Sequence, residues 1–187
     1  MATRCKTRPK DILLCAGDGN ASGIVPEIQL IPIDHVVSIP DPDADTYVIS
    51  GDFVLEADTR TAAEIAAGDP VDPIPAVFTR FQFKETGANY TTSTIGDEED
   101  NYVEHQVVFK IPKRSAEKSQ SLDQIKGREF LVLFTDRNRY QSVFGDTKEG
   151  MRFTILPTTD GNGYEVTGKY KAAREPYEYR GAVVTRE

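Results

Sequence analysis

The stretch Asp18-Gly-Asn-Ala-Ser-Gly23 has the residue types and spacing of the first half of a calcium-binding loop. Asp18, Asn20 and Ser22 would place side-chain oxygens at alternate positions, which is how such a loop surrounds a hard cation. The position where a bidentate Glu should close the site is Gln29. We therefore expect a polar turn and no metal site, with these three residues as the nearest candidates for metal ligands.

A second alternating set of carboxylates, Asp41, Asp43 and Asp45, has the same potential to bind a cation. Pro42 interrupts it, and the glycine that such a loop needs for its sharp turn is missing. This pattern predicts an ordinary acidic turn.

The chain has only two histidines, His35 and His105, and two cysteines, Cys5 and Cys15. Neither cysteine has zinc-type spacing to another ligand, so we expect both to be reduced, with Cys15 in the core. His105 falls on a strand face with valines, which favours a satisfied core or edge histidine over a catalytic base. Nucleophile-elbow and phosphate-loop motifs are absent from the sequence. We expect no enzymatic activity and no cofactor; a carboxylate pair that the sequence hides is the alternative.

Aromatic side chains on the expected strands could form a platform for sugars, because ring faces stack on sugar C–H groups. Core packing is the favoured interpretation, since the chain contains no tryptophan. The aromatic residues in question are Phe78, Phe81, Phe83, Tyr164 and Tyr170.

The segment 85–101 is rich in Thr, Ser and acidic residues and has no hydrophobic periodicity. We interpret it as a long exposed loop joining two paired strands, 77–84 and 102–111. Loops of this length in compact domains are usually functional or are disordered until they bind, so we predict an assembly loop. Its candidate contact residues are Thr91, Thr92, Ser93, Thr94, Asp97, Glu98, Glu99 and Asp100.

Length and composition indicate one domain, 1–187, that does not enter a membrane. The net charge is −8, and no apolar run approaches the roughly 20 residues that a span requires. Such a charge argues against ordinary nucleic-acid binding, which depends on Lys and Arg. Residues 1–10 are expected to form a flexible basic arm, and Ile12–Ala16 is too short for the apolar region of a secretory signal peptide, so we expect synthesis without export.

The elements expected in the first half are strands at 11–16, 27–37 and 46–57, followed by a Pro-rich excursion at 57–76. In the second of these strands Ile28 and Leu30 alternate with Ile31, while Pro32 suggests an edge position or a bulge. The excursion includes a helical turn at Thr61–Ala67, which Gly68 and three prolines end.

One helix is expected at Ser115–Lys126, with Ser115 as its N-cap, Leu122 and Ile125 as its apolar stripe and Gly127 at its C-terminal cap. An antiparallel meander follows it, because short β-rich runs alternate with turn residues. Its strands are Glu129–Thr135, Arg139–Phe144, Arg152–Ile155 and Tyr164–Tyr170.

The order of parts over Val77–Tyr170, with a strand pair, a long loop, a helix and a returning meander, resembles the tail tube proteins of long-tailed bacteriophages, particularly those infecting Bacteroidetes. The resemblance is architectural and does not rest on a motif. It implies a mainly β, tail-tube-like antiparallel sandwich or barrel with one principal helix and a long inter-strand loop. It also implies hexameric rings that stack through the loop around an electronegative channel for DNA.

The function expected from this resemblance is that of a virion structural protein, a tail tube subunit synthesised in the host cytoplasm. Its partners would be further copies of itself and other tail proteins, and DNA would pass without specific binding. A tail terminator, connector or baseplate-hub protein is the alternative within the virion. A monomeric β-sandwich binding module, which presents 85–101 to a glycan, protein or ion, is the alternative outside it.

Overall fold

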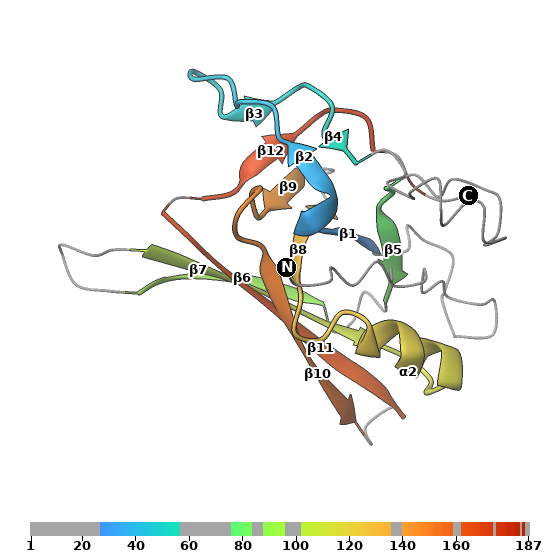
Figure 1. The fold of residues 1–187 in the computed structure, drawn as a ribbon. Helices are drawn as coiled ribbons and strands as arrows, with labels where there is room; N and C mark the ends of the chain where they lie inside the picture. Colours follow the sequence, from blue (N-terminus) through green and yellow to red (C-terminus); the bar gives the residue numbers. More distant parts are fainter. Residues whose placement is uncertain are drawn as a thin grey trace, which may run out of the picture.

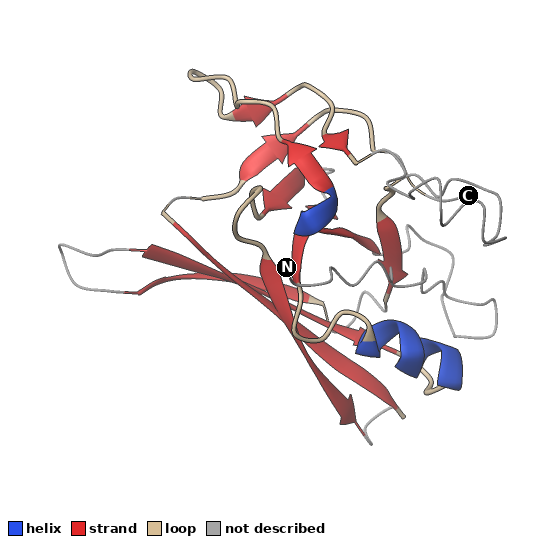
Figure 2. Cartoon of the chain, viewed as in Figure 1, coloured by secondary structure: helices blue, strands red, loops and turns tan. Residues whose placement is uncertain are grey.

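A computed structural model describes residues 27–56, 76–83, 88–95, 102–135, 140–158, 162–173, 175–183 and 185. This part of the chain is mainly β with one α-helix, as predicted (Figures 1 and 2). Its elements are β1 (Glu27–Pro32), the 3-10 turn η2 (Ile33–His35), β2 (Val36–Ser38), β3 (Val48–Ile49), β4 (Val54–Leu55), β5 (Thr79–Gln82), β6 (Asn89–Ile95), β7 (Tyr102–Ile111), α2 (Ala116–Asp123), β8 (Glu129–Thr135), β9 (Gln141–Phe144), β10 (Met151–Thr158), β11 (Gly163–Ala172) and β12 (Tyr177–Tyr179).

Strand β1 lies between β5 and β8 in the sheet. Leu30 pairs with Thr79 on one side and with Val132 on the other, and both pairings are antiparallel. Strand β1 is therefore not an edge strand as a whole, but Pro32 itself does occupy an edge position, because the pairing with β5 ends at Leu30 and Pro32 is paired only with Phe130. Proline is tolerated because it is the last residue of β1, where the chain turns into η2.

Strands β1 and β8 are buried on both faces, so that alternate side chains enter two separate apolar cores. Leu30 and Val132 belong to the first core, whereas Ile31 and Leu131 belong to the second. Burial on both faces explains why Phe130–Leu133 is an unbroken apolar run without the alternation of a half-exposed strand.

The first core is closed by a long antiparallel layer in the order β10, β11, β7, β6, which extends beyond the rest of the fold in Figure 1. Its inward face carries the alternating residues that the sequence predicted for β7, among them Val107, Phe109 and Ile111, all of which are buried. The layer joins β8 through only two register pairs, Met151 with Phe130 and Arg152 with Glu129.

Helix α2 covers one end of this core. Its N-cap is Ser115, whose Oγ accepts a hydrogen bond of 3.2 Å from the Lys118 backbone N–H, and Leu122 and Ile125 are buried, all as predicted. The helix ends at Asp123, three residues earlier than expected. Gly127 then adopts φ +69°, the left-handed conformation that favours glycine after a helix.

Two predicted strand pairings are wrong. The strand at 77–84 does not pair with 102–111: β5 pairs with β1, and β7 lies between β6 and β11. The last third is not a simple four-stranded meander either, because β9 and β10 do not pair with each other: both pair with β8, β9 along its second half and β10 at its first two residues. Alternation reports which face a side chain takes, but it does not report which strand lies alongside.

The turn that connects β9 to β10 requires the backbone of Gly150 to lie close to the backbone of Phe130 in β8. A Cβ there would lie 2.7 Å from the Phe130 backbone nitrogen, so a larger residue would push β10 away from β8. The predicted turn at Gly145-Asp146 is present, with Gly145 at φ +111° and bridged to Gly150.

The predicted strand 46–57 is instead two short strands, β3 and β4. Between them Gly51 approaches Pro40 so closely that a Cβ would lie 3.0 Å from the proline Cγ. Strand β12, which the sequence did not predict, pairs with β9 and runs parallel to β3. Residues 1–10 and nearly all of the 57–76 excursion lie outside the described residues; its last residue, Ala76, is buried in the second core.

Burial on both faces of β8 predicts that adjacent residues are equally intolerant of truncation. Phe130→Ala and Leu131→Ala should each lower the free energy of unfolding by about 2–5 kcal/mol, because each leaves a cavity in a different core. Thr135→Ala, at the exposed end of the same strand, should change it by less than about 0.5 kcal/mol. Chemical denaturation measures all three, and a tolerated Leu131→Ala would contradict the second core.

Candidate assembly surface

The segment predicted as an assembly loop contains a regular strand. Thr91, Thr92, Ser93 and Thr94 belong to β6, which pairs antiparallel with β7 from Asn89 opposite Val108 to Ile95 opposite Tyr102. The interpretation of 85–101 as a loop is therefore wrong for 89–95. An exposed strand buries no apolar face, so it leaves no hydrophobic alternation in the sequence. The other candidates, Asp97, Glu98, Glu99 and Asp100, lie outside the described residues.

Strand β6 ends the strand order of the sheet and has β7 as its one strand neighbour among the described residues. Its residues from Thr91 to Ile95 are exposed, and its sequence Asn-Tyr-Thr-Thr-Ser-Thr-Ile contains no charged residue and no proline. Proteins usually protect such an edge with Lys, Pro or a bulge, because its backbone groups can pair with another chain. The edge of β6 lacks the first two of these devices.

The buried side chain of His105, in β7, connects β6 to the rest of the layer. The hydroxyl of Tyr90 lies 3.0 Å from Nδ1 of His105, and Thr92 donates a hydrogen bond of 2.8 Å to that hydroxyl. His105 is fully buried, and its ring stacks against Tyr90 and Tyr170. This confirms the prediction of a satisfied core histidine.

The opposite edge of the layer is formed by β10. Its pairing with β8 stops at Arg152, and beyond the bridge from Phe153 to Lys126 no described strand accompanies residues 154–156 on that side. Pro157 follows; its missing N–H is tolerated at an edge. The four-stranded layer thus has two open edges, β6 along its length and β10 over its second half.

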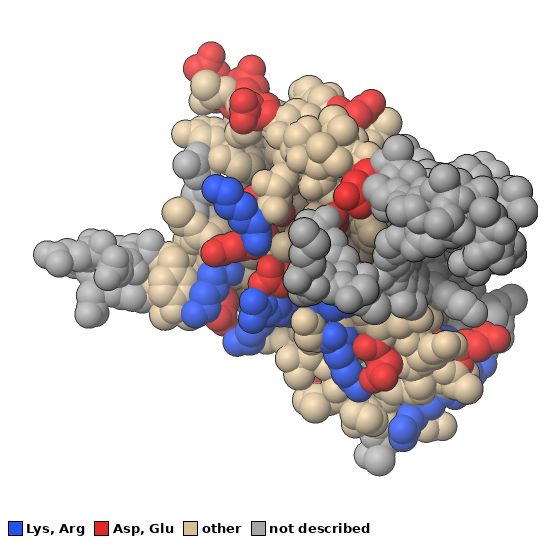
Figure 3. All heavy atoms as spheres, viewed as in Figure 1, with Lys and Arg blue, Asp and Glu red and all other residues tan. Residues whose placement is uncertain are grey.

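The outward face of the layer is mostly polar, with Leu156 and Ile95 as exposed apolar residues, and its cations contact carboxylates or an aromatic ring. Lys169 donates to Glu104 at 2.9 Å, and Lys110 lies 3.9 Å from Glu165. Lys171 lies 4.7 Å from the ring centre of Tyr102. In Figure 3 basic and acidic side chains lie next to one another on the viewed face.

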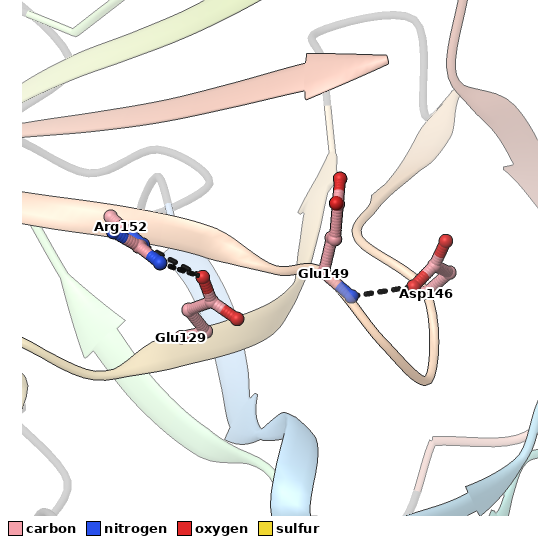
Figure 4. A network of polar contacts seen from close by, with 4 residues as sticks. All are labelled: Glu129, Asp146, Glu149 and Arg152. Atoms are coloured by element: carbon pink, nitrogen blue, oxygen red, sulfur yellow. Dashed lines mark hydrogen bonds and ion pairs between the residues drawn. The ribbon is translucent and has the colours of Figure 1, made fainter. Parts of the chain in front are cut away.

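A fourth cation of this face, Arg152, lies where β10 joins β8. Arg152 Nε donates to Glu129 Oε1 at 2.7 Å, as Figure 4 shows. In the neighbouring turn Asp146 Oδ1 accepts the backbone N–H groups of Lys148 and Glu149. Arg152, Glu129 and Glu149 line a groove of about 440 Å³ together with Glu104 and Lys169. None of these charged residues was predicted as a functional residue, although Glu104, Arg152 and Lys169 alternate with the buried residues along their strands.

The metal and sugar candidates have different outcomes. Asp18, Asn20 and Ser22 lie outside the described residues. Asp43 Oδ1 accepts hydrogen bonds from the Thr46 N–H and hydroxyl and from the Asp45 N–H, which lowers the pKa of this carboxyl and confirms an ordinary turn. Among the described residues no cluster of three or more His, Cys, Asp or Glu side chains is suited to a metal. Phe78, Phe81, Phe83 and Tyr164 are buried, so they do not form an exposed sugar platform.

Comparison with known proteins identifies no relative: no family model, curated protein or solved structure matches this chain. In the described part, no helix is long and apolar enough to cross a membrane.

The tyrosines around His105 predict a distinctive alkaline titration. Burial, and then the nearby charges of Asp146 and Glu149, raise the pKa of Tyr170 to about 12. Because the folded state holds this proton more tightly than the unfolded chain, its contribution to stability is complete below pH about 10 and is lost as the pH rises toward 12. Ultraviolet titration of the phenolates should show a late phase that loses amplitude in Tyr170→Phe; burial also raises the pKa of Tyr90 and of Tyr179, so part of the phase remains. A late phase of unchanged amplitude in Tyr170→Phe would contradict the assignment.

Proposed function

We propose that this protein is a ring-forming structural subunit of the tail-tube type, whose copies join edge to edge through the layer β10–β11–β7–β6. The observation that carries the proposal is the pair of open edges on one layer. An edge that is long, exposed and uncharged is a pairing site for another chain. Joining β6 of one copy to β10 of the next would remove both edges.

The strand directions support a closed ring. Each strand of the layer is antiparallel to its neighbour, so β10 and β6, at its two ends, run in opposite directions. Copies related by rotation about an axis would therefore place β6 beside β10 of the next copy in antiparallel orientation. Such head-to-tail contacts close into rings when the rotation allows it. The family resemblance puts the expected number of subunits at six.

Side-chain chemistry supports assignment of the polar face to the channel. The opposite face of the layer packs on the first core, so only the polar face can line an opening. Its described cations are each engaged by a carboxylate or by Tyr102, and they offer no strong site for the phosphates of passing DNA. The electronegative character expected for the channel would have to come from elsewhere, because this face is nearly balanced.

The proposed role places the protein in a bacteriophage tail, in contact with copies of itself and with other tail proteins. A terminator, connector or hub protein would use the same edges to form a single ring. A monomeric binding module is a separate candidate, and it is favoured by a groove that Tyr47, Tyr140 and Tyr177 line.

Edge pairing predicts that charge on β6 blocks assembly. Thr91→Lys/Ser93→Lys should leave the monomer folded, because both side chains are exposed, and should prevent ring formation in electron microscopy and light scattering. Gln106→Lys is the control for the Thr91→Lys change alone, since it adds the same single charge opposite Thr91 on the same face but on a strand with two neighbours. A wild-type chain that stays monomeric at high concentration, or a β6 variant that still forms rings, would overturn the proposal.

Engagement of the cations predicts that removal of carboxylates creates DNA binding. Glu104→Gln/Glu129→Gln removes the partners of Lys169 and Arg152, and should produce a salt-sensitive gel shift with double-stranded DNA that the wild type lacks. Asp123→Asn/Glu178→Gln changes the net charge equally but releases Lys126 and Arg180 outside the polar face. Equal DNA binding by both double variants would show that the net charge of the protein, and not the pairing of cations on this face, prevents DNA binding.

A further inference from the structure

A groove of about 500 Å³ lies at the opposite end of the strand order from β6. Three segments far apart in the sequence line it, with Tyr47, Tyr140, Glu175, Pro176 and Tyr177. Tyr47 and Tyr140 are 58% and 40% exposed, which is unusual for large aromatic side chains in a fold that buries six phenylalanines completely. The rings of Tyr47 and Tyr177 are nearly parallel, with an interplanar angle of 15° and centroids 6.4 Å apart.

Tyr47 is held in the groove at a conformational cost. Its φ is +57°, a left-handed conformation that is unfavourable for a bulky residue. The turn that imposes it is well fastened: the Tyr47 N–H donates to the Asp43 carbonyl at 2.9 Å, and the Asp43 N–H donates to the Val48 carbonyl at 3.0 Å. Strained residues with exposed side chains are concentrated at binding sites, where the surrounding structure maintains them.

The groove combines flat apolar faces with hydrogen-bonding groups of both kinds. The phenol hydroxyls can donate and accept, and the Glu175 carboxylate accepts only. A ligand for this groove must therefore present an apolar face together with several donors. The carboxylates of Glu175 and of the adjacent turn, Asp43 and Asp45, disfavour an anionic ligand.

We propose that this groove binds a short neutral oligosaccharide. The C–H face of a pyranose would stack on Tyr47 or Tyr177, while its hydroxyls donate to Glu175 and exchange hydrogen bonds with the phenols. The groove volume lies within the range of about 300–1,000 Å³ found for small-molecule sites. The site uses tyrosines on loops and strand ends, not the strand phenylalanines considered from the sequence.

Two other ligand classes fit the groove less well. A proline-rich peptide docks on aromatic rings, but its prolines offer carbonyl acceptors and no N–H donors, so Glu175 would lose its hydrogen bonds on burial. A quaternary ammonium group is attracted by tyrosines and a carboxylate, but it has no N–H or O–H to donate to Glu175 or to the phenols.

The groove is separate from the surfaces proposed for ring assembly. The groove is formed beside β3, β9 and β12, whereas the proposed subunit contacts use β6 and β10. If the protein does not form rings, the proposed sugar site still stands. If it does not bind sugars, the proposed ring assembly still stands.

The experiment is a titration of the purified full-length chain with maltoheptaose, cellohexaose and chitohexaose. The chain has eight tyrosines and no tryptophan, so its intrinsic fluorescence reports directly on tyrosines such as the three in the groove. We expect saturable binding of at least one of these sugars, and none of polygalacturonate. Tyr177→Ala should weaken binding by about tenfold or more, because a stacked ring is lost.

Tyr47→Gly gives the sharpest test. Glycine adopts a positive φ without strain, so this variant should melt at the same temperature as the wild type or higher, yet lose sugar binding. Tyr102→Ala removes a tyrosine on β7, outside the groove, and should bind as the wild type does. Silence of all three sugars at millimolar concentration, unchanged affinity in Tyr47→Gly, or a response only to decaproline or choline would each overturn the proposal.

Discussion

The rest of the structure depends on the burial of β1 and β8 on both faces. Because Leu30 and Val132 point into one core and Ile31 and Leu131 into the other, these two strands form the shared floor of both cores. A fully buried strand cannot tolerate unpaired backbone groups, so it needs neighbours on both sides. Strand β1 obtains them from β5 and β8, and β8 from β1 and β9, with β10 at its first residues.

The layer β10–β11–β7–β6 is joined to β8 by few backbone pairs, and this explains why β10 has an open edge among the described residues. Only two register pairs join β10 to β8, and Gly150 allows the approach. Past this junction the layer separates from the floor, and the first core fills the space between them. No strand among the described residues therefore pairs with β10 over residues 154–156, and Pro157 limits the length over which another strand could pair there.

The two proposed activities occupy different ends of the molecule and use different chemistry. Assembly would rely on backbone pairing at β6 and on a polar face whose cations are already engaged. Sugar binding would rely on a strained tyrosine that the Asp43 turn holds in place. In both cases the folded monomer retains an energetically unfavourable feature. For assembly this feature is the unpaired backbone edge of β6, and for sugar binding it is the left-handed backbone conformation of Tyr47.

The sequence alone determined the local features. The faces of β7, the apolar run of β8, the Ser115 cap, the buried Leu122 and the satisfied His105 could all be predicted, because each depends on neighbours within a few residues or on the period of a strand. Much of the fold class follows from these features. The candidate contacts Thr91–Thr94 were identified as exposed, but their strand was missed, since an exposed strand of Thr and Ser carries no hydrophobic signal.

Only the tertiary structure decided which strands are neighbours, where the sheet has edges, and which tyrosines meet. Tyr47 and Tyr177 come together because β12 returns to lie parallel to β3, and Arg152 meets Glu129 because β10 passes beside the start of β8. No local pattern encodes these contacts. Alternation specifies the face of a side chain, but the partner strand is selected by the packing of two whole cores against one shared sheet.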